Sequence, residues 1–155
     1  MKGAGRPPRL SPVFQKYDSP VYFVTICCAK RRHLLANNEV HSSFREFAIR
    51  ARQSNVAVGR YVLMPDHLHL FVSGPAEFRL QQWVRMLKVS LGKSLCDLGL
   101  KPTFWQRGFF DHFLRNSESY AEKWEYVRQN PVRAGLVQRP NDWPYQGEVV
   151  AIDRA

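Results

Sequence analysis

Two apolar segments joined by only two residues constrain the fold of this chain most strongly. Residues 56–64 and 67–73 are rich in valine, leucine and aromatic side chains, and only Pro65 and Asp66 stand between them. Segments of this composition and length are typical of β-strands. A connection this short predicts an antiparallel hairpin. The sequence therefore predicts an antiparallel sheet built around this hairpin.

The remaining periodic segments surround the hairpin in a recognisable order. The predicted elements are a strand over 21–28, a helix from about 39, the hairpin, a helix over 79–98, an extended segment over 104–115 and a helix over 119–130. Asn37 or Asn38 is the expected N-cap of the first helix. This order predicts an α+β fold of the ferredoxin-like type, an antiparallel sheet with helices packed on one face.

The length of 155 residues suits a single domain with its own core. We expect a basic, proline-rich arm over 1–20, one domain over 21–145 and a short tail over 146–155. No run approaches the roughly 20 apolar residues of a membrane helix, and the first residues lack the apolar part of a secretory signal. The expectation is a soluble intracellular protein without a membrane partner.

Charge indicates the class of partner. Lysine and arginine total 23 against 13 acidic residues, a formal net charge of +10. Such an excess predicts binding to a polyanion, but charge alone leaves DNA, RNA and an anionic membrane surface open. The three cysteines have no spacing typical of a disulfide framework or of a Cys-x-x-Cys metal pair.

A histidine pair in the second strand of the hairpin is the first candidate site. Residues two apart in a strand share a face, so His67 and His69 project to one side while Leu68 and Leu70 project to the core. Two imidazoles can bind one divalent cation, with a third ligand supplied from elsewhere. Asp66 is interpreted as a turn residue. The alternative is a solvated strand face with two incidental histidines.

A tyrosine in the last predicted helix is the second candidate. Tyr120, Trp124 and Val127 follow helical spacing and form its apolar stripe. Tyr126 lies roughly 130° away from that stripe, on the same side as Asn130 one turn later. A tyrosine hydroxyl beside a polar residue can serve as a nucleophile next to a metal ligand. The alternative is a half-exposed surface tyrosine beside a helix-ending asparagine.

Three ordered motifs resemble a known family. They are Met64-Pro65-Asp66-His67-Leu68-His69, the segment Trp105–Arg115, and Tyr126-Val127-Arg128-Gln129-Asn130-Pro131 with its continuation to Val137. Together they resemble the single-tyrosine HUH transposases, most closely the REP-associated tyrosine transposases of bacteria. The resemblance covers about residues 20–145.

The resemblance implies an HUH fold and metal-dependent cleavage and rejoining of single-stranded DNA at or near REP-like hairpins. It implies that His67 and His69 bind the divalent cation, Mg²⁺ or Mn²⁺, and that Tyr126 forms a 5′-phosphotyrosine intermediate. Asn130 stands where relatives carry a third, amide-bearing ligand. A cytoplasmic, nucleoid-associated protein is implied, as a monomer or a homodimer.

Basic side chains near these motifs are the expected contacts to the DNA backbone: Arg85, Lys88, Arg107, Arg128 and Arg133. Trp83 and Phe109 are aromatic side chains that could stack on unpaired bases, although aromatic residues more often belong to the core.

Three other functions compete with this interpretation. A histidine-triad nucleotide hydrolase needs a third histidine where this chain has Phe71. A zinc-stabilised structural protein usually uses thiol ligands that are missing from these motifs. The main alternative is a catalytically silent module that binds structured nucleic acid, although the presence of all the candidate catalytic residues argues against it.

Overall fold

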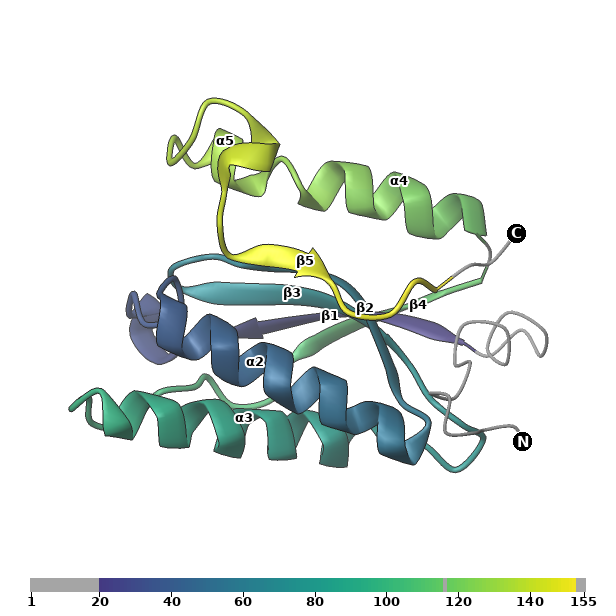
Figure 1. Cartoon of the computed structure of the whole chain (residues 1–155), viewed down its shortest axis with the longest axis horizontal. Coiled ribbons are helices and arrows are strands. Elements are labelled where there is room, and N and C mark those ends of the chain that lie inside the picture. Colours follow the sequence, from purple (N-terminus) through teal and green to yellow (C-terminus); the bar gives the residue numbers. More distant parts are fainter. Residues whose placement is uncertain (1–19, 116, 153–155) are drawn as a thin grey trace.

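A five-stranded antiparallel sheet forms the centre of the molecule (Figure 1). The computed structural model describes residues 20–115 and 117–152. The strands run in the order β4-β1-β3-β2-β5. They are β1 (Val21–Cys27), β2 (Ala57–Leu63), β3 (His67–Ser73), β4 (Phe110–Leu114) and β5 (Gln146–Glu148). β2 and β3 form the predicted hairpin, and β1 pairs with β3 on its other side.

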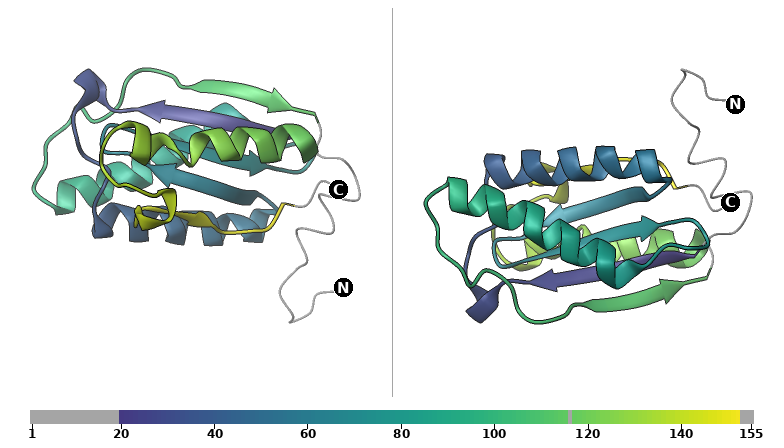
Figure 2. Two further views of the ribbon diagram at one scale, coloured as in Figure 1. Left: turned by 90° about the horizontal axis from the view of Figure 1, so that it is seen from above. Right: turned by 90° about the horizontal axis from the view of Figure 1, so that it is seen from below.

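Among the described residues, four α-helices lie on the two faces of this sheet (Figures 1 and 2). They are α2 (Asn38–Ala51), α3 (Leu80–Asp97), α4 (Ser117–Val127) and the single turn α5 (Asn130–Arg133). Three short 3₁₀ turns are η1 (Ala29–Arg31), η2 (Arg52–Ser54) and η3 (Pro140–Asp142). The α+β class and the ferredoxin-like order of the first four strands are confirmed.

The main core lies between the sheet and the pair α2 and α3. The apolar stripes of both helices are buried, as their spacing predicts. The sheet contributes Leu68, Leu70 and Val72 of β3, each at most 1% exposed. This packing fixes which face of β3 is apolar, and the alternation of the strand sends the histidines to the other face.

The last long helix departs from the one-face arrangement, because α4 covers the opposite face from α2 and α3 (Figure 1). Of the predicted stripe, Tyr120 is 8% exposed and Val127 2%, and Trp124 between them is half-buried. Its partners include Phe71, which shares a strand face with the histidines. A helical stripe predicts burial but not the sheet face that buries it. Phe71 makes the histidine face apolar enough at this point to accept a helix.

The C-terminal part belongs to the fold more closely than the expected tail over 146–155. β5 pairs with β2 at the edge of the sheet, and Val150 and Ile152 are buried. The strand has only three residues, too few for alternation to be visible in the sequence. Residues 153–155 and nearly all of the expected arm, 1–19, lie outside the described residues. Within residues 20–115 and 117–152, no helix has the length and apolar character needed to span a membrane.

The start of α2 gives a direct test of the local structure. The side chain of Asn37 accepts a hydrogen bond from the backbone N–H of Val40 at 2.9 Å and donates one to the carbonyl of Leu34 at 3.0 Å. We predict that Asn37→Ala lowers the free energy of unfolding by about 1 kcal/mol in urea titrations, because a helix-end donor loses its partner. Asn38→Ala, at the exposed neighbouring position, should change it by less than about 0.5 kcal/mol. Equal effects of the two substitutions would contradict this assignment.

Candidate active site

The two histidines of β3 stand side by side on the sheet, with ring centroids 4.8 Å apart. Nδ1 of His67 lies 2.8 Å from a carboxylate oxygen of Asp66, and Nδ1 of His69 lies 2.8 Å from the hydroxyl of Thr25 on β1. A carboxylate can only accept, so Nδ1 of His67 carries the proton. Both Nδ1 atoms are engaged, which leaves Nε2 of each ring as the nitrogen for a ligand. Polar partners of this kind orient metal-binding histidines in proteins.

Asp66 has a role that the sequence interpretation missed. It lies in the turn, as expected, but it also joins His67 to Arg31, whose Nε donates to the second carboxylate oxygen at 2.9 Å. Partial burial alone would raise the pKa of Asp66, but the hydrogen bonds from Arg31 and His67 outweigh it and hold that pKa below its usual value. Asp66 is therefore ionised and fixes the ring of His67. Its position directly before the histidine pair was the signal available in the sequence.

His69 is held in the neutral form that can bind a metal. Burial lowers its pKa to about 3, helped by the positive charges of Lys123 and Arg133. Its ring also stacks on Phe23 at a centroid distance of 5.1 Å. Lys123 lies on α4 and Arg133 on α5, so both helices bring positive charge close to the histidine pair.

Aromatic rings hold α4 against this face. Phe71 makes an edge contact with Tyr120, at a centroid distance of 4.7 Å, and a more distant one with Trp124. Gly59 of β2 lets Tyr120 approach closely, because a Cβ atom there would lie 2.5 Å from the tyrosine oxygen. The hydroxyl of Tyr120 accepts a hydrogen bond from the backbone N–H of Arg60. These contacts fix the rotation of α4 and therefore the direction in which its other side points.

Tyr126 lies on that other side, with 64% of its surface exposed. The guanidinium of Arg133 stacks on its ring at 4.1 Å and also donates a hydrogen bond to the side-chain oxygen of Asn130. The predicted pair Tyr126 and Asn130 is therefore brought together, and Arg133 joins them. The positive charge of Arg133 also lowers the pKa of His69. One arginine thus contacts two of the four predicted site residues and lowers the pKa of a third.

A shallow cavity of about 510 Å³ opens beside Tyr126. Its other lining residues are His112, Leu114, Ser119, Glu122 and Lys123. His112 is exposed on the edge strand β4. The tyrosine alone among the four predicted site residues lines this cavity.

The five arginines and lysines expected to contact DNA fall into separate groups. Arg133 lies in the site, and Arg128 pairs with Glu125 and Asn141 nearby. Arg107 is exposed in the connection before β4. Arg85 and Lys88 lie on α3, across the sheet from α4, the helix that carries Tyr126 (Figure 1). The ammonium of Lys88 donates to two backbone carbonyls, those of Gln106 and Gly108, so it holds a loop.

The donor set fits a divalent cation. His67 and His69 offer one nitrogen each, and Asn130 offers an amide oxygen if it exchanges its contact with Arg133. Within residues 20–115 and 117–152, no group of three or more histidine, cysteine, aspartate or glutamate side chains could hold a metal. A set of two imidazoles and one amide suits Mn²⁺ and its later neighbours, while Mg²⁺ would rely more on water.

Comparison with known proteins identifies relatives of this chain. The family described as "Transposase IS200 like" matches residues 18–130. The chain is similar to the REP-associated tyrosine transposase of Escherichia coli strain K12, with 27% identity over 128 residues that cover 80% of this chain and 73% of that protein. A Haemophilus influenzae protein, provisionally named a REP-associated tyrosine transposase, is 28% identical over 139 residues. The match covers 81% of this chain and 77% of that protein.

A solved structure shares the fold. It is a REP-associated tyrosine transposase bound to a REP hairpin, with a TM-score of 0.67 and 24% identity, covering 83% of this chain and 76% of that one. The expected resemblance to this group is confirmed.

The lowered pKa of His69 predicts a distinctive titration. In the metal-free protein, nuclear magnetic resonance should show no protonation of His69 between about pH 8 and pH 5, whereas the urea-unfolded chain should titrate near 6.5. Above pH 6.5 both states are neutral there. Below it only the unfolded chain gains a proton, so the stability of the folded state should decline as the pH falls from 6.5 towards 3. A folded-state midpoint near 6.5 would contradict the burial described here.

Proposed function

Because the chain belongs to the IS200-like transposase family, we propose that it cleaves and rejoins single-stranded DNA at or near hairpins, with Tyr126 as the nucleophile. The observation that carries this proposal is the position of Arg133, which stacks on Tyr126, contacts Asn130 and lowers the pKa of His69. An exposed tyrosine hydroxyl, a pair of oriented imidazoles and local positive charge are what attack on a phosphodiester requires.

The proposed step exchanges one phosphate ester for another. The hydroxyl oxygen of Tyr126 bonds to phosphorus as the bond to the 3′ oxygen breaks. The products are a 5′-phosphotyrosine and a free 3′-hydroxyl, which takes up a proton. No external energy source is needed for rejoining, because a second 3′-hydroxyl can attack the phosphotyrosine in the reverse reaction.

Positive groups around Tyr126 favour this reaction. Arg133 and Lys123 lie close enough to His69 to lower its pKa, and Lys123 also lines the cavity of Tyr126. Their charges attract the phosphate and stabilise the charge that develops on its oxygens. His112 and Glu122 line the same cavity and are able to accept the proton of the tyrosine.

We propose that His67, His69 and Asn130 hold a divalent cation, Mg²⁺ or Mn²⁺. Such an ion, when bound, neutralises phosphate charge and orients the phosphate for in-line attack. The residues of this chain prepare the site without it. Asp66 and Thr25 fix the two rings. The lowered pKa of His69 keeps its ring neutral, so that one of the two ring nitrogens stays available to a ligand.

The proposed partner is DNA that folds into a hairpin with unpaired flanks. A relative of known structure is a transposase bound to a REP hairpin, and the net charge of +10 suits a nucleic-acid backbone. In this proposal Arg128 and Arg133 contact the strand near the scissile phosphate, and Arg107 contacts it from the connection before β4.

A covalent adduct tests the nucleophile. We predict that a labelled hairpin oligonucleotide with unpaired flanks, incubated with Mg²⁺ or Mn²⁺, forms a band of protein and DNA that survives a denaturing gel. Tyr126→Phe should abolish the band, because the ring remains but the attacking oxygen is lost. Tyr145→Phe is the matched control and should keep it, since Tyr145 lies just before β5 and is not among the residues that line the cavity of Tyr126. An adduct in Tyr126→Phe refutes the nucleophile, and binding without reaction in any divalent cation favours a silent binding module.

Asp66 provides a separate test of the metal site. We predict that Asp66→Asn weakens Mn²⁺ binding by roughly 10- to 100-fold in calorimetric titrations, because the ring of His67 loses its anionic partner. Asp97→Asn removes the same charge from an exposed position at the end of α3 and should leave the affinity unchanged. Unchanged affinity in Asp66→Asn would show that the carboxylate has no part in the metal site.

A further inference from the structure

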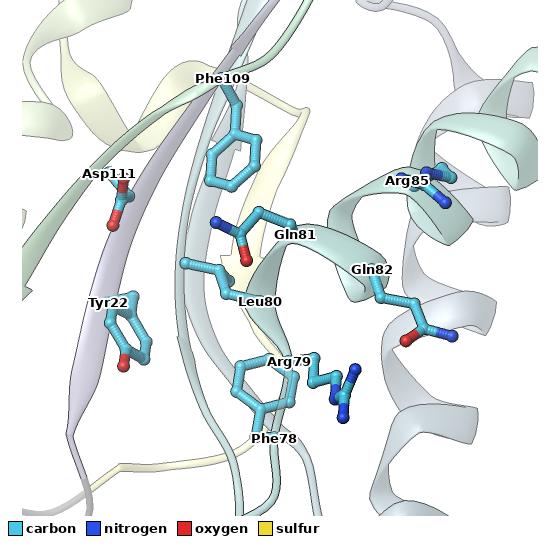
Figure 3. A pocket seen from close by; sticks show the side chains of 9 residues that line it. All are labelled: Tyr22, Phe78, Arg79, Leu80, Gln81, Gln82, Arg85, Phe109 and Asp111. Carbon is cyan, nitrogen blue, oxygen red and sulfur yellow. The ribbon is translucent and has the colours of Figure 1, made fainter.

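A second cavity lies on the sheet face that carries α3 (Figure 3). It has a volume of about 630 Å³ and opens between the start of α3 and the strands β1 and β4. We propose that it binds one unpaired nucleotide of the DNA strand outside the scissile site, with a preference for guanine. This inference rests on the proposed function for the identity of its ligand. The chemistry of the cavity carries the rest.

Three aromatic rings line the cavity: Tyr22 of β1, and Phe78 and Phe109 in the loops before α3 and β4. Figure 3 shows Phe109 at one end of the opening and Phe78 at the other, with Tyr22 on the strand side. Phe78 and Phe109 are half-buried, so each ring is anchored in the core and keeps one part accessible. Anchored rings with an open edge or face are the usual platforms on which unpaired bases stack.

Polar side chains of two kinds surround these rings. Arg79 and Arg85 are positive and exposed on the side of α3, where a phosphate would be held. Asp111 of β4 stands on the opposite side, beside Tyr22, and Gln81 extends between them (Figure 3). The cavity therefore separates a cationic wall from a hydrogen-bonding wall. A nucleotide, with its anionic phosphate and its neutral base, has the same separation.

These polar groups are available to a ligand. Within the part of the chain that the structure describes, Arg79, Arg85, Gln81 and Asp111 take part in no side-chain hydrogen bond or ion pair. Lys88 on the same helix differs, because two backbone carbonyls hold its ammonium. The predicted contact of Arg85 with DNA is therefore retained in this proposal, and that of Lys88 is replaced by a structural role.

The preference for guanine follows from Asp111. A carboxylate only accepts hydrogen bonds. Guanine is the one DNA base that presents two neighbouring N–H donors on its pairing edge, and so it matches two carboxylate oxygens. Thymine offers a single N–H donor between two carbonyl oxygens, which a carboxylate repels. Gln81 can donate to or accept from the rest of the base edge.

The edge strand β4 connects this cavity with the proposed active site. Asp111 lines the cavity on the α3 face, and the next residue, His112, lines the cavity of Tyr126 on the other face. β4 is the outermost strand on its side of the sheet. A single strand that passes around this edge reaches both cavities, which a stiff duplex does not. The geometry therefore assigns the second cavity to a nucleotide that flanks the cleavage position.

Binding measurements on an unpaired strand test the proposal. The probe is a labelled short oligothymidine with one central guanine, followed by fluorescence anisotropy with EDTA in a Tyr126→Phe background, so that no cleavage intervenes. We predict that Phe109→Leu weakens binding roughly 5- to 150-fold, the range for loss of one stacked base. Arg79→Ala and Gln81→Ala change exposed positions and should weaken binding without affecting folding, so they replace Phe109→Leu if that variant is unstable. Asp111→Asn should abolish the preference for the guanine probe over plain oligothymidine.

Lys93→Ala is the matched control, because it removes an exposed charge from α3 outside the cavity. It should reduce affinity much less than Arg79→Ala at the same salt concentration. Equal losses in these two variants, an unchanged affinity in Phe109→Leu and Gln81→Ala, or no binding of the unpaired probe would each overturn the proposal. Adduct formation by the wild-type protein on hairpin DNA is measured in parallel, so that this inference can fail while the proposed function stands.

Discussion

The packing of α4 on the histidine face is the interaction on which the candidate site depends. Phe71 of β3 contacts Tyr120 and Trp124, and these rings set both the height and the rotation of the helix above the sheet. With the apolar stripe turned down, Tyr126 must point away from the core. The same burial surrounds His69, whose pKa falls to about 3. One aromatic cluster therefore positions the proposed nucleophile and keeps a proposed ligand neutral.

Much of this arrangement could be predicted from local sequence patterns. The hairpin, the apolar stripes and the alternation of His67 and His69 depend on residues a few positions apart, where the geometry of strands and helices is fixed. The sheet face covered by α4 could not be predicted, because it depends on Phe23 and Phe71, which belong to distant segments. The three residues of β5 carried too short a pattern.

The individual side chains show the same limit. Asp66 was identified as a turn residue, yet its carboxylate has two partners, one of which, Arg31, is far away in the sequence. Lys88 carries the positive charge expected of a residue that contacts DNA. Only the structure shows that its ammonium donates hydrogen bonds to two backbone carbonyl oxygens instead. A charge in a sequence indicates a capacity for binding. Which group a charged side chain actually binds depends on how distant segments of the chain pack together.

The alternation of β3 also has a consequence for how such a chain can vary. Leucines of the core and histidines of the site occupy successive positions of one strand. A single inserted or deleted residue would turn both histidines into the core and expose the leucines. Residues that stabilise the core and residues of the candidate site therefore alternate along this strand. Evolution can substitute residues there, but an insertion or a deletion would disturb both. Tyr126 is exposed and outside the core, so a lineage that abandons the reaction can lose it first and keep the fold.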